Sequence, residues 1–138
     1  MPALVFHEML NKKFKSFISS DLRGLNYFNR KKYNPKVVET PQIFNSYLLF
    51  PLKIILILYL IIQSIFFLKK NKIDIVFSTG GYAPIPLCIA SLILKKRLFI
   101  YEPNLVIGKS NRFFLPYCQK VFCHSYKIKL FPKKFENK

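Results

Sequence analysis

The pattern of apolar and polar positions is most informative between residues 73 and 94. Residues 73–77 form a short apolar run rich in β-branched side chains, which predicts a buried parallel strand. The run stops at the pair Gly80-Gly81, and residues 84–94 then form an apolar stretch that predicts a helix. A glycine pair here lets backbone N–H groups approach a phosphate or a sugar closely, and a plain turn with positive φ is the alternative.

The flanking segments predict the remaining elements. On the amino-terminal side they predict a helix over residues 2–10 and strands over 14–19 and 36–39. On the carboxyl-terminal side they predict a strand over 97–101, a helix over 111–119 with Ser110 as N-cap, a strand over 120–123 and a lysine-rich tail. This order predicts an α/β fold with a doubly wound parallel sheet.

An almost wholly apolar segment covers about residues 47–68 and predicts a long hydrophobic helix. Its uninterrupted part, residues 54–68, is shorter than the ~20 residues that span a bilayer core. Lysines flank that part on both sides, which is typical of a helix lying at a membrane surface. A sheet-covering helix and a true transmembrane span are the alternatives.

Composition narrows the class of partner. The chain has 138 residues, 51% of them hydrophobic, and a formal net charge of +17, so it is long enough for one folded domain with a cationic surface. Such a surface favours anionic partners, although an AT-rich genome would also enrich lysine. The basic residues are spread along the chain without a nucleic-acid-binding motif, so we expect no nucleic acid as partner.

The three cysteines, Cys88, Cys118 and Cys123, form no CxxC pair and are odd in number, which predicts buried thiols in a reducing cytoplasm. Cys123 and His124 are neighbours on a predicted strand and would point to opposite faces, which argues against a nucleophile with its base. No cluster of metal-ligating side chains is apparent, so we expect no metal site and no cofactor.

The predicted strand ends bring the candidate chemistry together. Residues 78–82, 102–104 and 124–126 each follow a strand, and ligands of parallel α/β sheets bind at that edge. Asn104 suits a sugar hydroxyl, Tyr82 offers an aromatic face and a hydroxyl, and Glu102 is a candidate to orient or deprotonate a hydroxyl group. A turn residue, a core cap and an ion-pair partner are the respective alternatives.

Four motifs in the second half of the chain carry a family resemblance. They are STGGYAPIP at residues 78–86, YEPN at 101–104, GKSNR at 108–112, and KV with HSY at 120–126. In order and spacing they resemble the amino-terminal domain of the MurG-type UDP-N-acetylglucosamine transferases. The start of the chain also resembles the segment that follows the first glycine loop of that family.

The resemblance implies a GT-B enzyme of two Rossmann-like domains that is inverting and metal-independent. Its reaction transfers GlcNAc from UDP-GlcNAc to the undecaprenyl-linked MurNAc-pentapeptide of peptidoglycan synthesis, peripherally on the cytoplasmic face of the bacterial inner membrane. It further implies that Gly80, Gly81 and Tyr82 lie near the acceptor diphosphate and that Asn104 contacts UDP-GlcNAc. The hydrophobic helix and the lysines would then face anionic lipid.

This sequence departs from the family pattern in several places. Tyr101 and Pro103 replace a histidine and a glutamine, and the first glycine loop of the family is absent. We therefore expect residues 1–126 to form a partial acceptor-binding domain and residues 127–138 a basic tail, with the donor domain absent and the chain alone inactive. The catalytic residue stays unknown apart from the candidate Glu102. A non-catalytic, membrane-anchoring subunit of a split glycosyltransferase is the alternative function.

Overall fold

The computed structural model describes residues 2–26, 33, 35–40, 50–125 and 127–137. It divides into two compact units, Met1–Glu39 and Thr40–Lys138. The described strands form a two-stranded sheet and a three-stranded sheet, and every pairing is parallel. The predicted α/β class with parallel strands is confirmed, although the sequence predicted one sheet where the described strands form two.

The first unit combines short elements. Helix α1 spans Pro2–Leu10, as predicted, and strand β1 (Ser19–Ser20) pairs with β2 (Lys36–Val37). Helix α2 (Leu22–Leu25) begins at Asp21, whose side chain accepts a hydrogen bond of 2.8 Å from the Gly24 N–H. The strand predicted over residues 14–19 is shorter and lies later in the chain, because β2 pairs only with Ser19 and Ser20 and reaches back no further than the Ile18 carbonyl, which accepts from the Lys36 N–H at 2.9 Å.

Two side chains of α1, His7 and Glu8, contact residues that follow the helix. His7 accepts or donates a hydrogen bond of 2.9 Å with the Ser16 hydroxyl, and Glu8 accepts one from the Tyr33 hydroxyl. The His7 and Tyr33 rings also meet edge to face. These contacts give both residues a local structural role.

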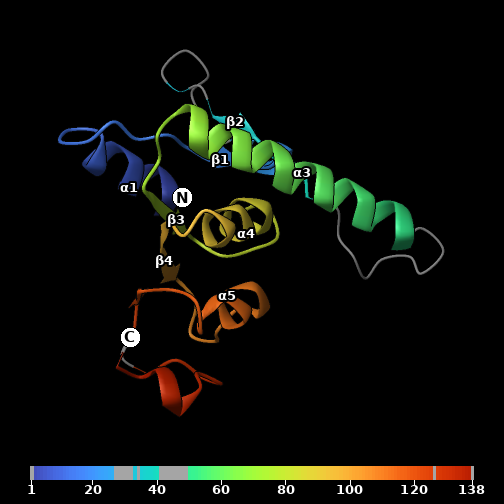
Figure 1. The fold of residues 1–138 in the computed structure, drawn as a ribbon. Helices are drawn as coiled ribbons and strands as arrows, with labels where there is room; N and C mark the ends of the chain where they lie inside the picture. The colour runs from blue at the N-terminus through green and yellow to red at the C-terminus, as the bar shows by residue number, and fades with distance from the viewer. Residues whose placement is uncertain (1, 27–32, 34, 41–49, 126, 138) are drawn as a thin grey trace. The chain divides into compact units, whose positions relative to one another are not determined.

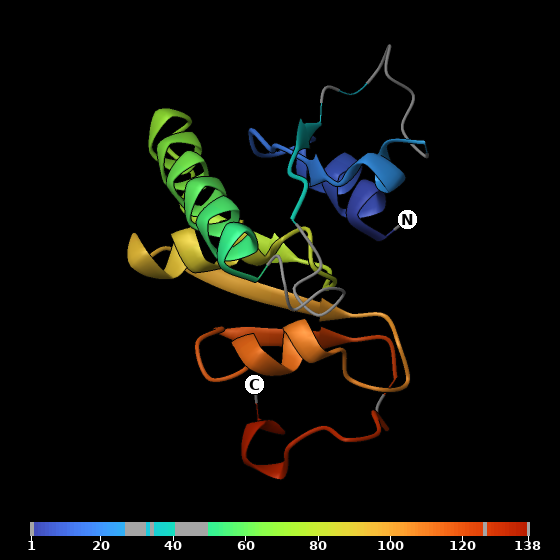
Figure 2. The ribbon, with the colours of Figure 1, turned by 90° about the vertical axis from the view of Figure 1, so that its right-hand side faces the viewer.

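The second unit is organised around strands β3 (Ile75–Ser78), β4 (Arg97–Glu102) and β5 (Lys120–Cys123), in that order. Helix α4 (Ile85–Ile93) connects the first two and α5 (Lys109–Phe114) the last two. Figure 2 shows the strands side by side with their connecting helices. Because all three run in one direction, their carboxyl ends share one edge of the sheet.

Alternation along the strands separates two faces of this sheet. In β4, Leu98, Ile100 and Glu102 are buried while the intervening residues are partly exposed. The buried face packs against α4 and α5 (Figure 1), and the core consists of these residues: Cys88, Leu98, Ile100, Ile107, Phe114, Leu115 and Cys118. Two of the three cysteines are therefore buried, as predicted, and Cys123 is exposed.

Helix α3 spans Phe50–Lys70 and is the longest helix of the described chain, where the sequence predicted a helix over about 47–68. It lies along α4 (Figure 1) and buries Ile61, Ser64 and Leu68. The Ser64 hydroxyl donates to the Leu60 carbonyl at 2.7 Å, so the buried polar group is satisfied within the helix. Residues 41–49 lie outside the described residues.

Residues 127–137, expected as a basic tail, pack on the second unit. Ile128, Phe131 and Phe135 contact its core, and Lys133–Phe135 forms a 3₁₀ turn. Lys129 forms a parallel bridge with Val106, in which the Lys129 N–H donates to the Leu105 carbonyl at 2.7 Å. This segment therefore covers the connection between β4 and α5.

Candidate functional site

The carboxyl ends of β3 and β4 carry the predicted site residues. Ser78 ends β3 opposite Ile100, and Glu102 ends β4 opposite Cys123. The Gly80-Gly81 loop follows β3, and the loop of residues 103–108 follows β4. Both loops therefore lie at the edge of the sheet where ligands of α/β proteins bind.

Glu102 is the centre of a buried hydrogen-bond cluster. The residue is 1% exposed, and its Oε1 accepts from the Asn104 backbone N–H at 3.1 Å and from the Asn104 Nδ2 at 2.9 Å. Its Oε2 accepts from the Gly108 N–H at 2.8 Å and from the Asn111 Nδ2 at 2.9 Å. A general base must reach a substrate proton, whereas this carboxylate faces inward, so the geometry favours a positioning role for the candidate Glu102.

Asn104 is the exposed member of this cluster. Its N–H and Nδ2 are both used on Glu102, which fixes the orientation of the side chain. Among the described residues, no donor contacts its Oδ1 oxygen. Asn104 can therefore offer an oriented acceptor to a ligand hydroxyl group.

The Gly80-Gly81 loop adopts a backbone conformation that favours glycine at both positions. The φ angles are 82° at Gly80 and 84° at Gly81. A Cβ atom on Gly80 would lie 2.9 Å from the Asn111 Nδ2, whereas one on Gly81 would have no heavy atom within 4 Å. The Gly80 N–H donates to the Ser78 hydroxyl at 3.2 Å, and Gly81 is exposed toward solvent.

Tyr82 leads from this loop into α4. It is half-buried, and its carbonyl accepts from the Ile85 N–H at 3.1 Å. Tyr82 thus belongs to the turn that starts α4 and directly follows the glycine pair.

Sequence reasoning did not single out Asn111 as a site residue. The side chain is 1% exposed, and its Nδ2 bridges the Tyr101 carbonyl at 3.2 Å and Glu102. Its place in the motif of residues 108–112 was the available signal. The prediction that Ser110 is the N-cap of α5 was wrong: the helix begins after Gly108, so Ser110 lies inside the first turn with a buried hydroxyl.

The end of β5 contributes fewer groups to the candidate site than the ends of β3 and β4. The His124 N–H donates to the Glu102 carbonyl at 3.1 Å, and its ring is exposed. Burial and the nearby Glu102 charge raise the pKa of the Cys123 thiol, which is the opposite of what a nucleophilic thiolate needs. Tyr126 lies outside the described residues.

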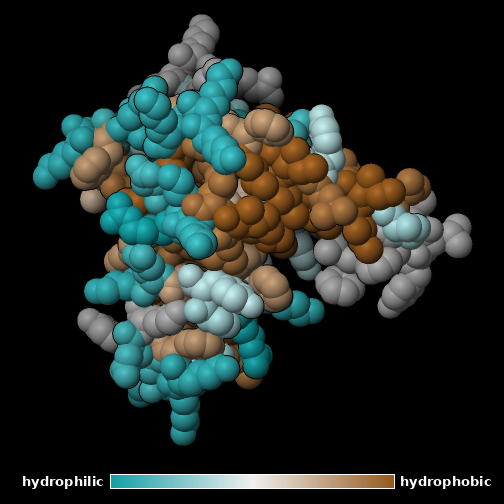
Figure 3. Space-filling model, viewed as in Figure 1, coloured by the Kyte–Doolittle hydropathy of each residue, from teal (hydrophilic) through white to brown (hydrophobic). Residues whose placement is uncertain are grey.

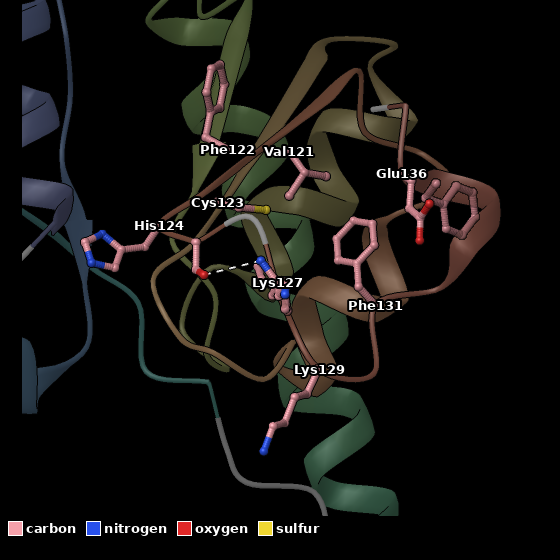
Figure 4. A pocket seen from close by; sticks show the side chains of 11 residues that line it. Val121, Phe122, Cys123, His124, Lys127, Lys129, Phe131 and Glu136 are labelled. Carbon is pink, nitrogen blue, oxygen red and sulfur yellow. Dashed lines mark hydrogen bonds between the residues drawn. The ribbon is translucent and has the colours of Figure 1, made fainter.

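An open pocket of about 860 Å³ lies beside β5. Figure 4 shows Val121, Cys123 and Phe131 turned toward it and Phe122 turned away, as strand alternation requires. The Ser125 hydroxyl accepts from the Lys127 N–H at 3.3 Å on its rim. Of the described residues at the predicted strand ends, His124 and Ser125 line this pocket, whereas the Gly80-Gly81 loop and Asn104 lie outside it.

Within residues 2–26, 33, 35–40, 50–125 and 127–137, no three side chains of His, Cys, Asp or Glu are grouped so as to hold a metal ion. The candidate chemistry at the edge comprises backbone N–H groups, amides, a tyrosine and the buried Glu102 carboxylate.

Comparison with known families decides the class of protein. The amino-terminal domain model of glycosyltransferase family 28 matches residues 28–123, which include both loops of the edge. The chain belongs to glycosyltransferase family 28. The resemblance read from the motifs is therefore confirmed at the level of the family.

Individual members of family 28 are similar over long stretches. A transferase of Pelagibacter ubique (strain HTCC1062) is 46% identical over 138 residues, which is 100% of this chain and 39% of the relative. A transferase of Prochlorococcus marinus (strain AS9601) is 40% identical over 93 residues, covering 66% of this chain and 25% of the relative. Both are named UDP-N-acetylglucosamine--N-acetylmuramyl-(pentapeptide) pyrophosphoryl-undecaprenol N-acetylglucosamine transferase.

A solved structure of the same type shares the fold. The crystal structure of Acinetobacter baumannii MurG superposes with a TM-score of 0.74 at 21% identity and covers 96% of this chain and 39% of that chain. The amino-terminal half of a GT-B glycosyltransferase is thus confirmed as the fold class. The chain spans about two fifths of the length of these relatives.

Proposed function

We propose that this chain contributes the acceptor-binding, membrane-facing domain of an inverting transferase of GlcNAc. The reaction moves GlcNAc from UDP-GlcNAc to an undecaprenyl-linked MurNAc-pentapeptide, which converts lipid I into lipid II. The observation that carries the proposal is the 46% identity, over every residue of this chain, to a relative named for that transfer.

The geometry of the sheet edge supports a role in binding these substrates. At Gly80 and Gly81 the absence of side chains lets a diphosphate approach the backbone N–H groups at the start of α4. Asn104, held by Glu102, presents an acceptor for a sugar or ribose hydroxyl of UDP-GlcNAc. Tyr82 adjoins the glycine pair and adds an aromatic face for the acceptor.

Helix α3 supports a peripheral location at an anionic membrane on the cytoplasmic face. Five of its exposed apolar residues recur at intervals of three and four positions and form one stripe along the helix. The members of this stripe are Leu52, Ile55, Tyr59, Ile62 and Phe66, all more than half exposed, and Leu58, 54% exposed, lies beside it. Figure 3 shows the continuous apolar surface along α3. Lys69 and Lys70 at its end would meet anionic headgroups.

The proposal is tested by binding to vesicles of two compositions. One contains the undecaprenyl-linked MurNAc-pentapeptide in a phosphatidylglycerol background, and the other contains phosphatidylglycerol alone at matched charge. The wild-type chain is expected to bind the first more tightly, and Tyr82→Ala and Asn104→Ala are expected to remove that difference while keeping binding to the second. Equal binding of the wild-type chain to both vesicles would exclude acceptor recognition.

A second candidate function is favoured by the length of α3. Residues Pro51–Lys70 are long and apolar enough to cross a membrane by length and composition, and 17% of that window is buried. Core helices of soluble proteins pass the same length test, but they are mostly buried. The chain would then be the membrane-anchoring, non-catalytic subunit of a split transferase.

Extraction and co-purification distinguish the two functions. A peripheral domain is released from membranes by alkaline carbonate, whereas a spanning anchor stays in the pellet. A separate donor-binding chain that co-purifies with this chain, together with transfer of GlcNAc only by the pair, would establish the subunit function.

A further inference from the structure

The buried Asn111 side chain lies next to both loops of the candidate site. Its Nδ2 donates to the Glu102 Oε2 at 2.9 Å and to the Tyr101 carbonyl at 3.2 Å, so it is tied to the end of β4. The same nitrogen lies 2.9 Å from the position that a Cβ atom of Gly80 would occupy. One buried amide therefore fills the space between the glycine loop and the loop that carries Asn104.

The carbonyl oxygen of the Asn111 side chain accepts no hydrogen bond from the described residues. The Asn111 Oδ1 is buried, and no donor among the described residues reaches it. A buried oxygen without a donor destabilises the folded state, so its presence in a folded protein needs a structural explanation. The reason here is geometric, since a flat amide of this size donates to Glu102 and also fills the space that a side chain at Gly80 would take.

We propose that Asn111 is a positioning residue that couples the Gly80-Gly81 loop to the loop of residues 103–108. Loss of its Nδ2 donor loosens both loops together, although they follow different strands. The consequence for substrate binding rests on the proposed function, but the coupling itself is a property of the free chain.

Substitution of Asn111 by aspartate tests this with almost no change of shape. The new carboxyl group would face the Glu102 carboxylate at hydrogen-bond distance. Two carboxyl groups this close share a proton at low pH and repel each other when both are ionised. The hydrogen bond to Glu102 is therefore absent at pH 8 and restored as the pair takes up a proton toward pH 5.

Other titratable groups of the described residues lie on the elements around this pair. Cys123 on β5 faces Glu102, and its pKa is raised, so its thiol stays protonated over this pH range. Lys109 and Arg112, both exposed on α5, are the same in every variant. The exposed ring of His124, which follows β5, and Tyr101, which precedes Glu102 on β4, are likewise the same in every variant.

The measurement is amide hydrogen exchange of peptides that cover residues 78–84 and 103–108, followed by mass spectrometry and corrected for the intrinsic rate at pH 5 and pH 8. Asn71→Asp is the matched control, because the Asn71 Nδ2 also donates one hydrogen bond of 2.9 Å, to the Phe67 carbonyl at the end of α3. Peptides of α4 report on the stability of the whole unit.

For Asn111→Asp at pH 8, we expect exchange in both loops to rise at least tenfold relative to wild type, with α4 less affected, and to fall back toward wild type at pH 5. Asn71→Asp is expected to leave both loops unchanged. A rise confined to residues 103–108 would overturn the coupling, and an equal, pH-independent rise in all peptides would mean a purely structural role.

Binding of the same variants to the acceptor vesicles separates this inference from the proposed function. If wild type recognises the acceptor, Asn111→Asp should lose that recognition at pH 8 and regain it at lower pH. If wild type does not recognise the acceptor, the proposed function fails, while the exchange result still decides whether Asn111 couples the loops.

Discussion

Replacing Ile55 and Ile62 of α3 together with serine is expected to release the chain from anionic vesicles. Both side chains belong to the exposed stripe, with 62% and 53% of their surface exposed. Neither belongs to the buried side of α3, which packs against α4. The double variant should therefore fold like wild type, which circular dichroism and thermal unfolding check.

The size of the effect follows from the exposed fraction. Complete burial of an isoleucine side chain is worth about 1.5–3 kcal/mol, so the exposed part of each contributes roughly 1–2 kcal/mol when it enters the membrane. The two residues are seven positions apart, about 10 Å along the helix, so their contributions should add. The sum of roughly 2–3.5 kcal/mol corresponds to a loss of about 30- to 400-fold in the partition coefficient.

The assay is co-sedimentation with phosphatidylglycerol vesicles at fixed ionic strength. Leu105→Ser with Leu130→Ser is the matched control, because these side chains are 61% and 68% exposed and remove as much apolar surface away from α3. The control variant should keep at least a third of the wild-type affinity. An equal loss in both double variants, or no loss in the α3 variant, would refute membrane contact through the stripe.

Three further predictions concern the second unit. Gly80→Ala should lower the free energy of unfolding by about 1–3 kcal/mol more than Gly81→Ala, because both share a positive φ but only Gly80 lacks space for a Cβ atom; urea denaturation measures this. The hydrogen bond and charge of Lys96 lower the pKa of Asp74, so this contribution to stability is present at neutral pH and is lost as the pH falls through the folded-state pKa. Acid titration should therefore destabilise wild type more than Asp74→Asn between pH 5 and pH 2. Iodoacetamide at pH 8 should label Cys123 and leave the buried Cys88 and Cys118 unlabelled until urea is added, which mass spectrometry measures. Burial raises the pKa of the Cys88 thiol to about 12, so this thiol is also protonated at pH 8.

Local patterns were sufficient to predict the central part of the fold. The strand of residues 120–123 and the helix over 2–10 have the predicted bounds, and the strand beginning at Arg97 continues one residue further, to Glu102. These elements carry their own signals, such as the run of apolar and aromatic residues 98–101 in β4. The long apolar helix was also predicted, and its described part runs from Phe50 to Lys70, two residues beyond the predicted end.

The rest depends on contacts that no local pattern encodes. Glu102 reads as an available carboxylate in the sequence, and its burial under four donors arises only when Gly108 and Asn111 return to the end of β4. The packing of residues 127–137, expected as a basic tail, also depends on contacts between distant segments of the chain. Its phenylalanines look like isolated residues among lysines until the fold places them against the core.

The bridge between Lys129 and the β4–α5 connection has a consequence for how this domain can be exchanged between proteins. Leu105 and Ile107 both hydrogen-bond to the Lys129 backbone, directly after the asparagine at the edge of the sheet. A graft that ended at residue 126 would strip these partners from the connection and uncover the core beneath Phe131 and Phe135. The junction of a chimaera should therefore lie after the 3₁₀ turn, so that the lysine-rich segment is transferred together with the domain.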